Sequence, residues 1–319
     1  MNLNNNSKRL PCTLLLPLFN GKDFLNQSIQ NLISIAGPDD EILIIDDGSK
    51  DISKHELSTI NNLDSRIVIY SCEHRGLVET LNFGIRKATH EFIARVDVDD
   101  VYEHDRLKLQ VEFLTNHPDI SAVFTDYRMV GKSGANLGLF PSAISPELTA
   151  FSLVSSQRTA HPSVMYRKSA VIAIGGYDPE DFPAEDLALW IKLADDGKIA
   201  SLPDVLLKYT YHGGSITRSN QILMRSKSQK LRSEFAYRSS NILTIDNARN
   251  LLLQYKGIPY RNLRLLFFIH DLLLFNQFTN YKYQKKIIVL LASIITSRFF
   301  CLLPALVYVL FMKFKRKFL

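Results

Sequence analysis

The stretch EFIARVDVDD, residues 91–100, runs from an apolar segment directly into three aspartates within four positions. Such a cluster is a poor continuation of a β-strand, and like charges at this spacing repel one another. A metal cation, a helix N-terminus or plain solvent could each make the cluster tolerable. In the second case Asp99 or Asp100 would cap a helix that is predicted to begin near Asp105.

Upstream of this stretch, short apolar segments alternate with segments of helical periodicity. The predicted strands are CTLLLPLFN (12–20), EILIIDDGSKD (41–51) and RIVIYSC (66–72), and the predicted helices are KDFLNQSIQNLISI (22–35) and GLVETLNFGIRKAT (76–89). This alternation is typical of an α/β fold with a parallel sheet.

Polar residues gather where the predicted strands end. Phe19-Asn20, Asp46-Asp47 and the aspartates of 97–100 all follow apolar runs. In open α/β sheets, ligands bind at the carboxyl ends of the strands, so these residues are predicted to build one site. The chain has no GxGxxG after its first strand and no GxxxxGK[ST], which argues against a dinucleotide-binding dehydrogenase and a P-loop enzyme.

The second half of this region is less regular. A helix over 105–120 leads to a strand over 121–130, and the segment 131–160 is rich in glycine and proline and is predicted as loop. A clear helix follows in EDLALWIKLADDG (185–197), and strands are predicted around Pro203.

Charge divides the chain into two regions. Residues 1–215 carry 20 Lys/Arg against 29 Asp/Glu, whereas residues 216–319 carry 18 against 3. Hydrophobic residues at 46% and charged residues at 22% describe an ordinary globular composition. We predict a polar tail over 1–10, one domain over 11–217 and a basic helical extension over 218–319.

The extension contains long apolar runs, which favour a membrane over nucleic acid as the partner of its basic residues. Residues 287–312 form a 26-residue segment with one charge, Arg298, and a proline at 304. A helix in the plane of the membrane, a true span, and a buried or partner-docking soluble helix all stay open. Basic residues flank both ends, so the positive-inside rule assigns no orientation.

The remaining signals concern the compartment. Cys12, Cys72 and Cys301 show neither metal-binding nor disulfide spacing, which fits a reducing compartment. The first dozen residues lack the apolar run of a signal peptide. A cytoplasmic location at the inner face of the membrane is therefore predicted, with the C-terminal region as the peripheral contact or anchor.

The aspartate cluster permits metal chemistry. Asp97 and Asp99 would point to the same side of an extended segment. Mg²⁺ and similar hard cations bind one or two carboxylates together with phosphate oxygens. A Mg²⁺ or Mn²⁺ ion held here would favour a diphosphate as its remaining ligand.

Several motifs in order resemble the family-two nucleotide-sugar glycosyltransferases of bacterial surface-polysaccharide type. The similarity runs from Thr13 to about Thr217, through LPLFN, IIDDGSKD, GLVETLNFGIRKATHEFIARVDVDD, HPSVMYRK, GGYD, AEDLALWIKLA and YTYHGGSIT. The resemblance implies a GT-A fold, that is, a Rossmann-like mixed sheet flanked by helices. The basic region after it would be a helical, membrane-associating extension.

The resemblance implies a donor-binding set of Pro17, Phe19, Asn20, Asp46 and Asp97. In that set Phe19 would be a platform for the nucleotide base, Asp46 would hydrogen-bond the base, and Asp97 would contact the ribose or the sugar. The alternative for Asp46 is a helix cap for the segment after residue 49.

The resemblance also implies a metal-binding side of the site. Asp99 would be the metal ligand, Asp100 a supporting carboxylate, and Asp47 would orient the neighbouring loop. His212 would approach the diphosphate or the metal from a C-terminal loop. Arg75 and Arg95 could neutralise phosphate, although arginines in such positions are usually solvated.

Asp186, after Glu185 in AEDLALW, matches the acid that removes the acceptor proton in inverting members. This reaction asks for a carboxylate opposite the leaving diphosphate and within reach of the nucleophile, and the start of a helix tends to keep such an acid ionised. The alternative is that both acids only occupy a first helical turn. Trp190 could line the acceptor pocket or pack in the core, and His161 could touch a sugar or be structural.

Taken together, the sequence predicts an inverting, Mn²⁺- or Mg²⁺-dependent glycosyltransferase with a nucleoside-diphosphate sugar donor, UDP rather than another nucleotide. The acceptor would be a saccharide or a lipid-linked saccharide of an O-antigen or capsule. A processive synthase, a catalytically inactive sugar-nucleotide binder or scaffold, and a nucleotidyltransferase are the alternatives.

Overall fold

The computed structural model describes part of the chain, and the arrangement below refers to that part. The described residues are 9–142, 149, 152–153, 159–195, 198–212 and 220–238. The predicted tail over 1–10 and extension over 218–319 lie mostly outside this set, and the apolar segment 287–312 lies entirely outside it.

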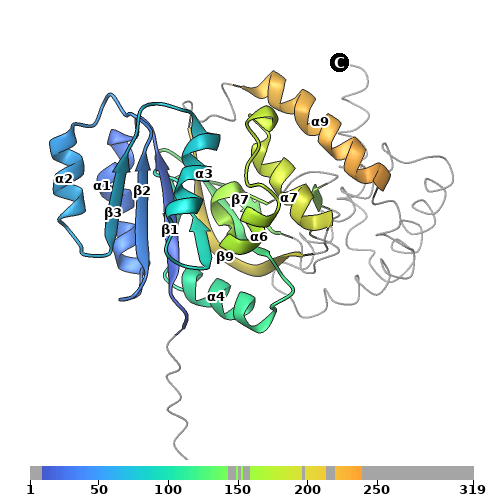
Figure 1. Ribbon diagram of the computed structural model, residues 1–319, viewed down its shortest axis with the longest axis horizontal. Coiled ribbons are helices and arrows are strands. Elements are labelled where there is room, and N and C mark those ends of the chain that lie inside the picture. The colour runs from blue at the N-terminus through green and yellow to red at the C-terminus, as the bar shows by residue number, and fades with distance from the viewer. Residues whose placement is uncertain are drawn as a thin grey trace, which may run out of the picture.

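The first half of the domain is the predicted parallel sheet (Figure 1). Its strands are β1 (Cys12–Leu18), β2 (Glu41–Asp46), β3 (Ile67–Ser71) and β4 (Phe92–Arg95), in the order β3-β2-β1-β4. They are joined through helices α1 (Lys22–Ile35), α2 (Lys54–Asn61) and α3 (Leu77–Lys87). All three strand pairings in this half are parallel, so the carboxyl ends of β1, β2 and β4 meet at one edge.

The second half makes the sheet mixed. It contains β5 (Val101–Tyr102), β6 (Ala122–Gly131), β7 (Asn136–Phe140), β8 (Met165–Arg167) and β9 (Ile199–Tyr211). The path continues β4-β8-β6-β9-β5, in which β8 is antiparallel to both β4 and β6, and β9 is parallel to β6 but antiparallel to β5. The mixed sheet implied by the resemblance is therefore confirmed.

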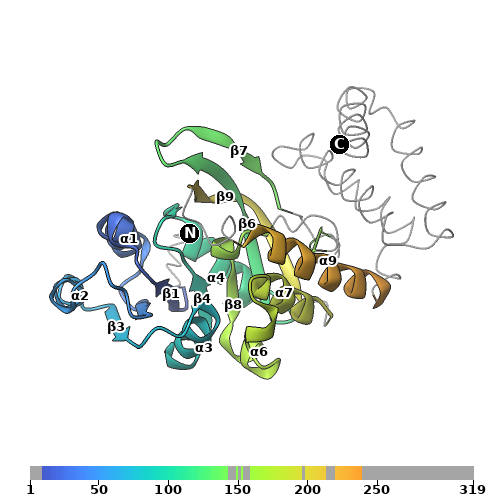
Figure 2. The same cartoon turned by 90° about the horizontal axis from the view of Figure 1, so that it is seen from above.

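Two details differ from the sequence-based expectation. Strand β7 lies inside the segment predicted as loop and forms a hairpin with β6, visible at the upper edge of the sheet in Figure 2. Its glycine at 138 hides the strand pattern, because glycine is depleted in strands. The strands predicted around Pro203 are one long strand, β9, whose register against β6 shifts near this proline, which has no N–H to donate.

Side-chain alternation along β1 explains the two layers of the core. Leu14 and Leu16 pack with α1, α2 and α4 (Arg106–Asn116) on one face, whereas Leu15 packs with the helices of the other face. The elements of that other face are α3, α6 (Lys168–Ala173) and α7 (Glu185–Asp195). Gly84 lets α3 approach β1 closely, since a Cβ there would lie 2.3 Å from Leu15 Cδ1.

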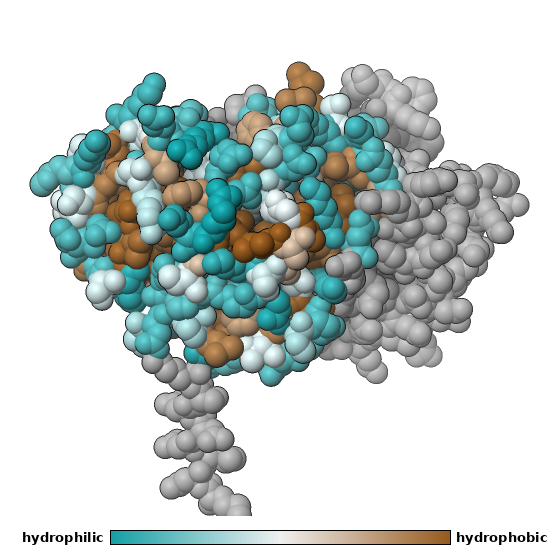
Figure 3. Space-filling view, in the orientation of Figure 1, coloured by the Kyte–Doolittle hydropathy of each residue, from teal (hydrophilic) through white to brown (hydrophobic). Residues whose placement is uncertain are grey.

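Helix α9 (Gln221–Arg238) packs beside α7, and Phe235 is fully buried in the same core cluster as α7. The two short 3₁₀ segments, His161–Ser163 and Pro179–Asp181, flank β8 and α7. Within the described residues, no helix combines the length and the apolar character needed to cross a bilayer. The face seen in Figure 3 is mainly hydrophilic, with small separate apolar patches.

Candidate functional site

The loops after β1 and β2 are joined by hydrogen bonds. Asn20, which has a positive φ of 51°, donates its N–H to Ser49 Oγ at 3.0 Å, and its side-chain oxygen accepts from the N–H of residue 50 at 2.8 Å. Asp46 Oδ1 accepts from Ser49 N–H at 3.0 Å. Helix α2 is capped by Ser53, so the helix-cap alternative for Asp46 is wrong.

Asp47 fixes the next loop along this edge. Its carboxylate is buried and accepts from the N–H groups of Arg75 at 2.7 Å and Gly76 at 2.9 Å, and it lies 2.8 Å from His74 Nδ1. The imidazole of His74 stacks on Phe19 with ring centres 4.2 Å apart. Phe19 is 45% exposed, so an apolar ring lies open beside two anchored loops. Pro17 of β1 lies two positions before Phe19 and is paired with Ile45 of β2.

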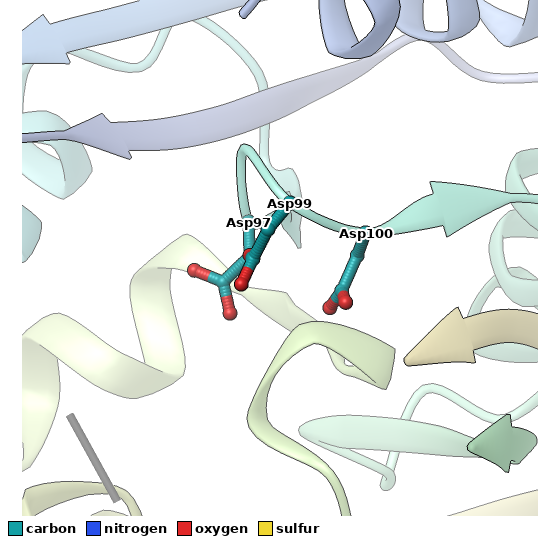
Figure 4. A group of neighbouring side chains, drawn as sticks. All are labelled: Asp97, Asp99 and Asp100. Carbon is teal, nitrogen blue, oxygen red and sulfur yellow. The ribbon is translucent and has the colours of Figure 1, made fainter. Parts of the chain in front are cut away.

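The three aspartates after β4 converge. One carboxylate oxygen from each of Asp97, Asp99 and Asp100 lies within 4.8 Å of the others, and Figure 4 shows all three side chains on the same side of the loop. The expected extended segment is wrong, because residues 98–99 form a turn. The turn brings Asp100 to the same side as its two neighbours, which strand alternation would prevent. None of the three caps a helix, since α4 begins at 106 and its N-cap side chain makes no capping bond.

Arg95 is the buried cation of this cluster. It is 4% exposed and forms an ion pair with Asp97, so the expectation that it is solvated is wrong. Burial raises the pKa of Asp97 despite this pairing, and the charge of Asp99 acts in the same direction.

The site also contains a buried carboxylate oxygen without a hydrogen-bond partner within the described residues. Asp100 Oδ1 accepts from the N–H of Thr210 on β9 at 2.7 Å, but its buried Oδ2 has no hydrogen-bond partner within the described residues. Burial and the charges of Asp97 and Asp99 raise the pKa of Asp100 well above its usual range. His212 Nε2 lies 2.6 Å from Asp99 Oδ2. Three carboxylates, one with an unpartnered oxygen, fit a Mn²⁺ or Mg²⁺ ion.

A second pair of acids begins α7. Asp186 is half-buried, and its Oδ1 accepts from the N–H of Leu187 at 2.6 Å. Glu185 is buried, and its Oε2 has no hydrogen-bond partner within the described residues. Burial, followed by the charge of Asp186, raises the pKa of Glu185 to about 7. The Glu185 carboxyl therefore titrates near neutral pH.

The other residues predicted for the acceptor side lie in the interior. Trp190 is fully buried and packs edge-on against Phe124 at 5.0 Å and His161 at 5.7 Å, so of its two alternatives the structure shows core packing. His161 Nε2 is 2.8 Å from the hydroxyl of Tyr177. Burial and the nearby charge of Arg95 lower the pKa of His161 well below its usual range, so this histidine is neutral.

Sequence reasoning missed His74, Tyr177 and the buried state of Arg95. A signal existed for Tyr177, because it belongs to the GGYD motif. The hydroxyl lies in the electrostatic neighbourhood of Glu185, Asp186 and Arg95, as their effects on its pKa show. The charge of Arg95 acts both on Asp97 of the aspartate cluster and on Glu185 of α7.

Two solved structures share the fold of this chain. S. aureus TarS bound to UDP-GlcNAc shares the fold with a TM-score of 0.55 at 16% identity, covering 90% of this chain and 81% of that one. A mannosyltransferase from Pyrobaculum calidifontis, bound to GDP-Man and Mn²⁺, gives 0.55 at 16% identity, with 95% and 86% covered. The fold is thus the GT-A fold of glycosyltransferases, as expected.

The particular family follows from the sequence comparison. The chain belongs to glycosyl transferase family 2, whose model matches residues 13–175. The amylovoran biosynthesis glycosyltransferase of Erwinia amylovora is 28% identical over 203 residues, which is 61% of this chain and 74% of that relative. An uncharacterised glycosyltransferase of Rickettsia conorii is 26% identical over 294 residues, or 88% of this chain, yet this chain spans only 47% of that relative's length.

Proposed function

We propose that this chain is an inverting, metal-dependent glycosyltransferase that uses a nucleoside-diphosphate sugar. The observation that carries the proposal is the convergence of Asp97, Asp99 and Asp100 in one turn, opposite His212, in a family 2 chain. The relative from Erwinia amylovora acts in amylovoran biosynthesis, which supports a role in making a surface polysaccharide.

The edge formed by β1, β2 and β4 is the proposed donor site. The exposed ring of Phe19 would carry the base, Asp46 would bond it, and Pro17 and Asn20 would shape the same wall. Asp97 would contact the ribose or the sugar. The GT-A fold holds UDP-GlcNAc in one similar structure and GDP-Man in another, so the fold does not select the nucleotide, and UDP is proposed from the family resemblance.

Asp99 and His212 would hold the cation, and Asp100 would support them with its unpartnered oxygen. The bound cation would neutralise the negative charge that develops on the diphosphate leaving group. Asp47 would keep the adjoining loop in place through its two bonds to backbone N–H groups. Arg95, which is paired with Asp97, would limit the repulsion among the aspartates.

Asp186 is the proposed general base. It would take the proton of the acceptor hydroxyl while that oxygen attacks the anomeric carbon and the bond from this carbon to the diphosphate oxygen breaks. One displacement inverts the configuration. Glu185 lies next to it in the chain, and burial, followed by the charge of Asp186, raises the pKa of Glu185 to about 7.

The acceptor and the location of the protein are proposed from the sequence. A saccharide or lipid-linked saccharide would be the acceptor, at the cytoplasmic face of a membrane that the extension over 218–319 contacts. The transferred group would be a hexosyl or an N-acetylhexosaminyl group. The extension would bring the donor site to a lipid-linked substrate through its basic and apolar residues.

A panel of nucleotide sugars, incubated with the full-length protein and Mn²⁺, tests the proposal by transfer or slow hydrolysis. Asp186→Asn is expected to reduce turnover by at least about 100-fold, because general base catalysis contributes roughly 10²–10⁴. UDP and Mn²⁺ affinity should stay within about twofold of the parent. Asp195→Asn, the same substitution at the exposed end of α7, is the control. Full activity of Asp186→Asn would exclude it as the base.

The cation is tested separately. Asp99→Ala should remove the dependence of UDP affinity on Mn²⁺, because it deletes the carboxylate that faces His212. The parent protein should bind UDP more tightly with Mn²⁺ than without it. Equal UDP affinity of the parent under both conditions would contradict a metal-dependent donor site.

A further inference from the structure

Tyr102 closes the loop that carries the three aspartates. Its hydroxyl accepts the N–H of Asp97 at 2.6 Å and lies 3.4 Å from the carbonyl oxygen of the same residue. Asn31 of α1 holds the backbone of Tyr102 from the other side, with bonds of 2.8 Å to its N–H and 3.0 Å to its C=O. The Tyr102 side chain thus joins the two ends of the loop, Asp97 and Tyr102, and Asn31 anchors the backbone of Tyr102.

Arg106 lies beneath this loop and is completely buried. Its guanidinium carbon is 4.5 Å from the centre of the Tyr102 ring. Nη2 donates to the carbonyl oxygens of Arg95 and Val164, both at 3.0 Å, and Nε donates to Gln110 Oε1 at 3.0 Å. These bonds fix the end of β4, from which the loop departs.

The charge of Arg106 is not matched by a carboxylate in direct contact. All its hydrogen bonds in the described residues go to neutral oxygens, and its buried Nη1 has no hydrogen-bond partner there. A buried cation without a counter-ion is costly. Burial lowers the pKa of Arg106, and the charge of Asp100 opposes this at longer range, while the charge of Arg106 acts to lower the pKa of Asp97.

We propose that Tyr102 and Arg106 are positioning residues that hold the aspartate turn in its cation-binding geometry before any cation arrives. The inference rests on the proposed function, because it assumes that this turn binds a divalent cation. Three carboxylates within 4.8 Å would otherwise separate in the free protein and would have to be brought together on binding. Neither residue needs to touch the cation or the donor.

The nature of the cation gives this proposal a distinctive consequence. Mg²⁺ requires nearly ideal octahedral geometry, whereas Ca²⁺ accepts flexible arrangements of six to eight oxygens. A turn that has lost its support should therefore lose affinity for Mg²⁺ much more than for Ca²⁺. A general loss of folding would weaken both cations alike.

Tyr102→Phe tests the proposal, because it removes the hydroxyl and keeps the ring that Arg106 contacts. Mn²⁺ binding to the full-length protein, without nucleotide, is measured from the paramagnetic resonance signal of free Mn²⁺, and Mg²⁺ and Ca²⁺ are measured by competition. We expect affinity for Mn²⁺ and Mg²⁺ to fall roughly fivefold, which corresponds to about 1 kcal/mol, and affinity for Ca²⁺ to fall less than about twofold.

Tyr70→Phe on β3 is the matched control, since this half-buried tyrosine lies on the same sheet but not in the loop. Arg106→Lys is the second variant: it keeps a positive charge, loses the bonds from Nη2 and should weaken Mn²⁺ binding as well. Unchanged Mn²⁺ and Mg²⁺ affinity in Tyr102→Phe would overturn the inference, as would an equal loss for all three cations. If the parent protein binds no Mn²⁺, both the inference and the proposed metal dependence fail.

Discussion

Glu185→Gln is expected to raise the free energy of unfolding at pH 8 and to leave it almost unchanged at pH 4.5. Burial and the charge of Asp186 raise the pKa of Glu185 from an ordinary value of 4.5 to about 7. A raised carboxyl pKa means that the folded state binds the proton more tightly than the unfolded state. Stability therefore falls as the pH rises from 4.5 to 7 and stays low above 7.

The size of the effect follows from the two pKa values. A difference of about 2.5, at about 1.36 kcal/mol for each tenfold change in proton affinity, gives roughly 3 kcal/mol as the upper value. Because solvent and side chains relax around the charge, the measured gain in Glu185→Gln at pH 8 should be about 1–3 kcal/mol. The raised pKa values of Asp97 and Asp100 are present in both proteins and largely cancel in the comparison.

The assay is urea unfolding of the full-length protein at a series of pH values between 4.5 and 8.5. Trp190 is the only tryptophan of the chain and is fully buried in the same helix, so its fluorescence reports directly on this region. Glu79→Gln, an exposed acid in the first turn of α3, is the control and should show no such pH dependence. A gain that is the same at pH 4.5 and pH 8 would refute the assignment of a buried, proton-binding Glu185.

Three further results are expected. Gly176→Ala should lower the free energy of unfolding by about 1–3 kcal/mol, because φ is +74° and a Cβ would lie 2.5 Å from Asn82 Oδ1. Gly134→Ala is the control: φ is +81° but no atom lies within 4 Å of the added Cβ, so the free energy of unfolding should fall less. Phe19→Ala should weaken UDP binding, measured by calorimetry, roughly tenfold through lost stacking, and parental affinity would exclude the platform role. Removing residues 285–319 should release the protein from anionic vesicles in a flotation assay, and continued binding would move the contact upstream.

The parallel half of the fold was predictable because each of its strands is an apolar run that ends in polar residues. For β1, β2 and β4 the local sequence and the final environment agree, since all three are buried on both faces. The position of the site followed from the same rule, because parallel strands bring their carboxyl ends to one edge. The pairing of Asp99 with His212 came only from the family resemblance, and the structure places the two side chains in contact.

The parts that could not be predicted depend on partners far away in the sequence. From the sequence, Arg95 looks like a solvated arginine on an edge strand. In the structure its strand, β4, pairs with β8, and Arg95 forms an ion pair with Asp97. The turn at 98–99 is flanked by two long-range contacts, since Asp100 is bonded to Thr210 and Tyr102 to Asn31. No periodicity in the chain reports such contacts, and a cluster of acids looks the same whether it caps a helix, faces water or closes a loop.

The bond between Thr210 and Asp100 spans 110 positions of the chain, and the contact between His212 and Asp99 spans 113. Loops of this length close late, because their entropy must be lost before the contact contributes. The wall formed by β1 and β2 can assemble from the first hundred residues, whereas the aspartate turn waits for β9. During synthesis the aspartate turn, which is the proposed cation site, is therefore expected to form after this wall, so that affinity for Mn²⁺ would distinguish molecules with a complete site from partly folded ones.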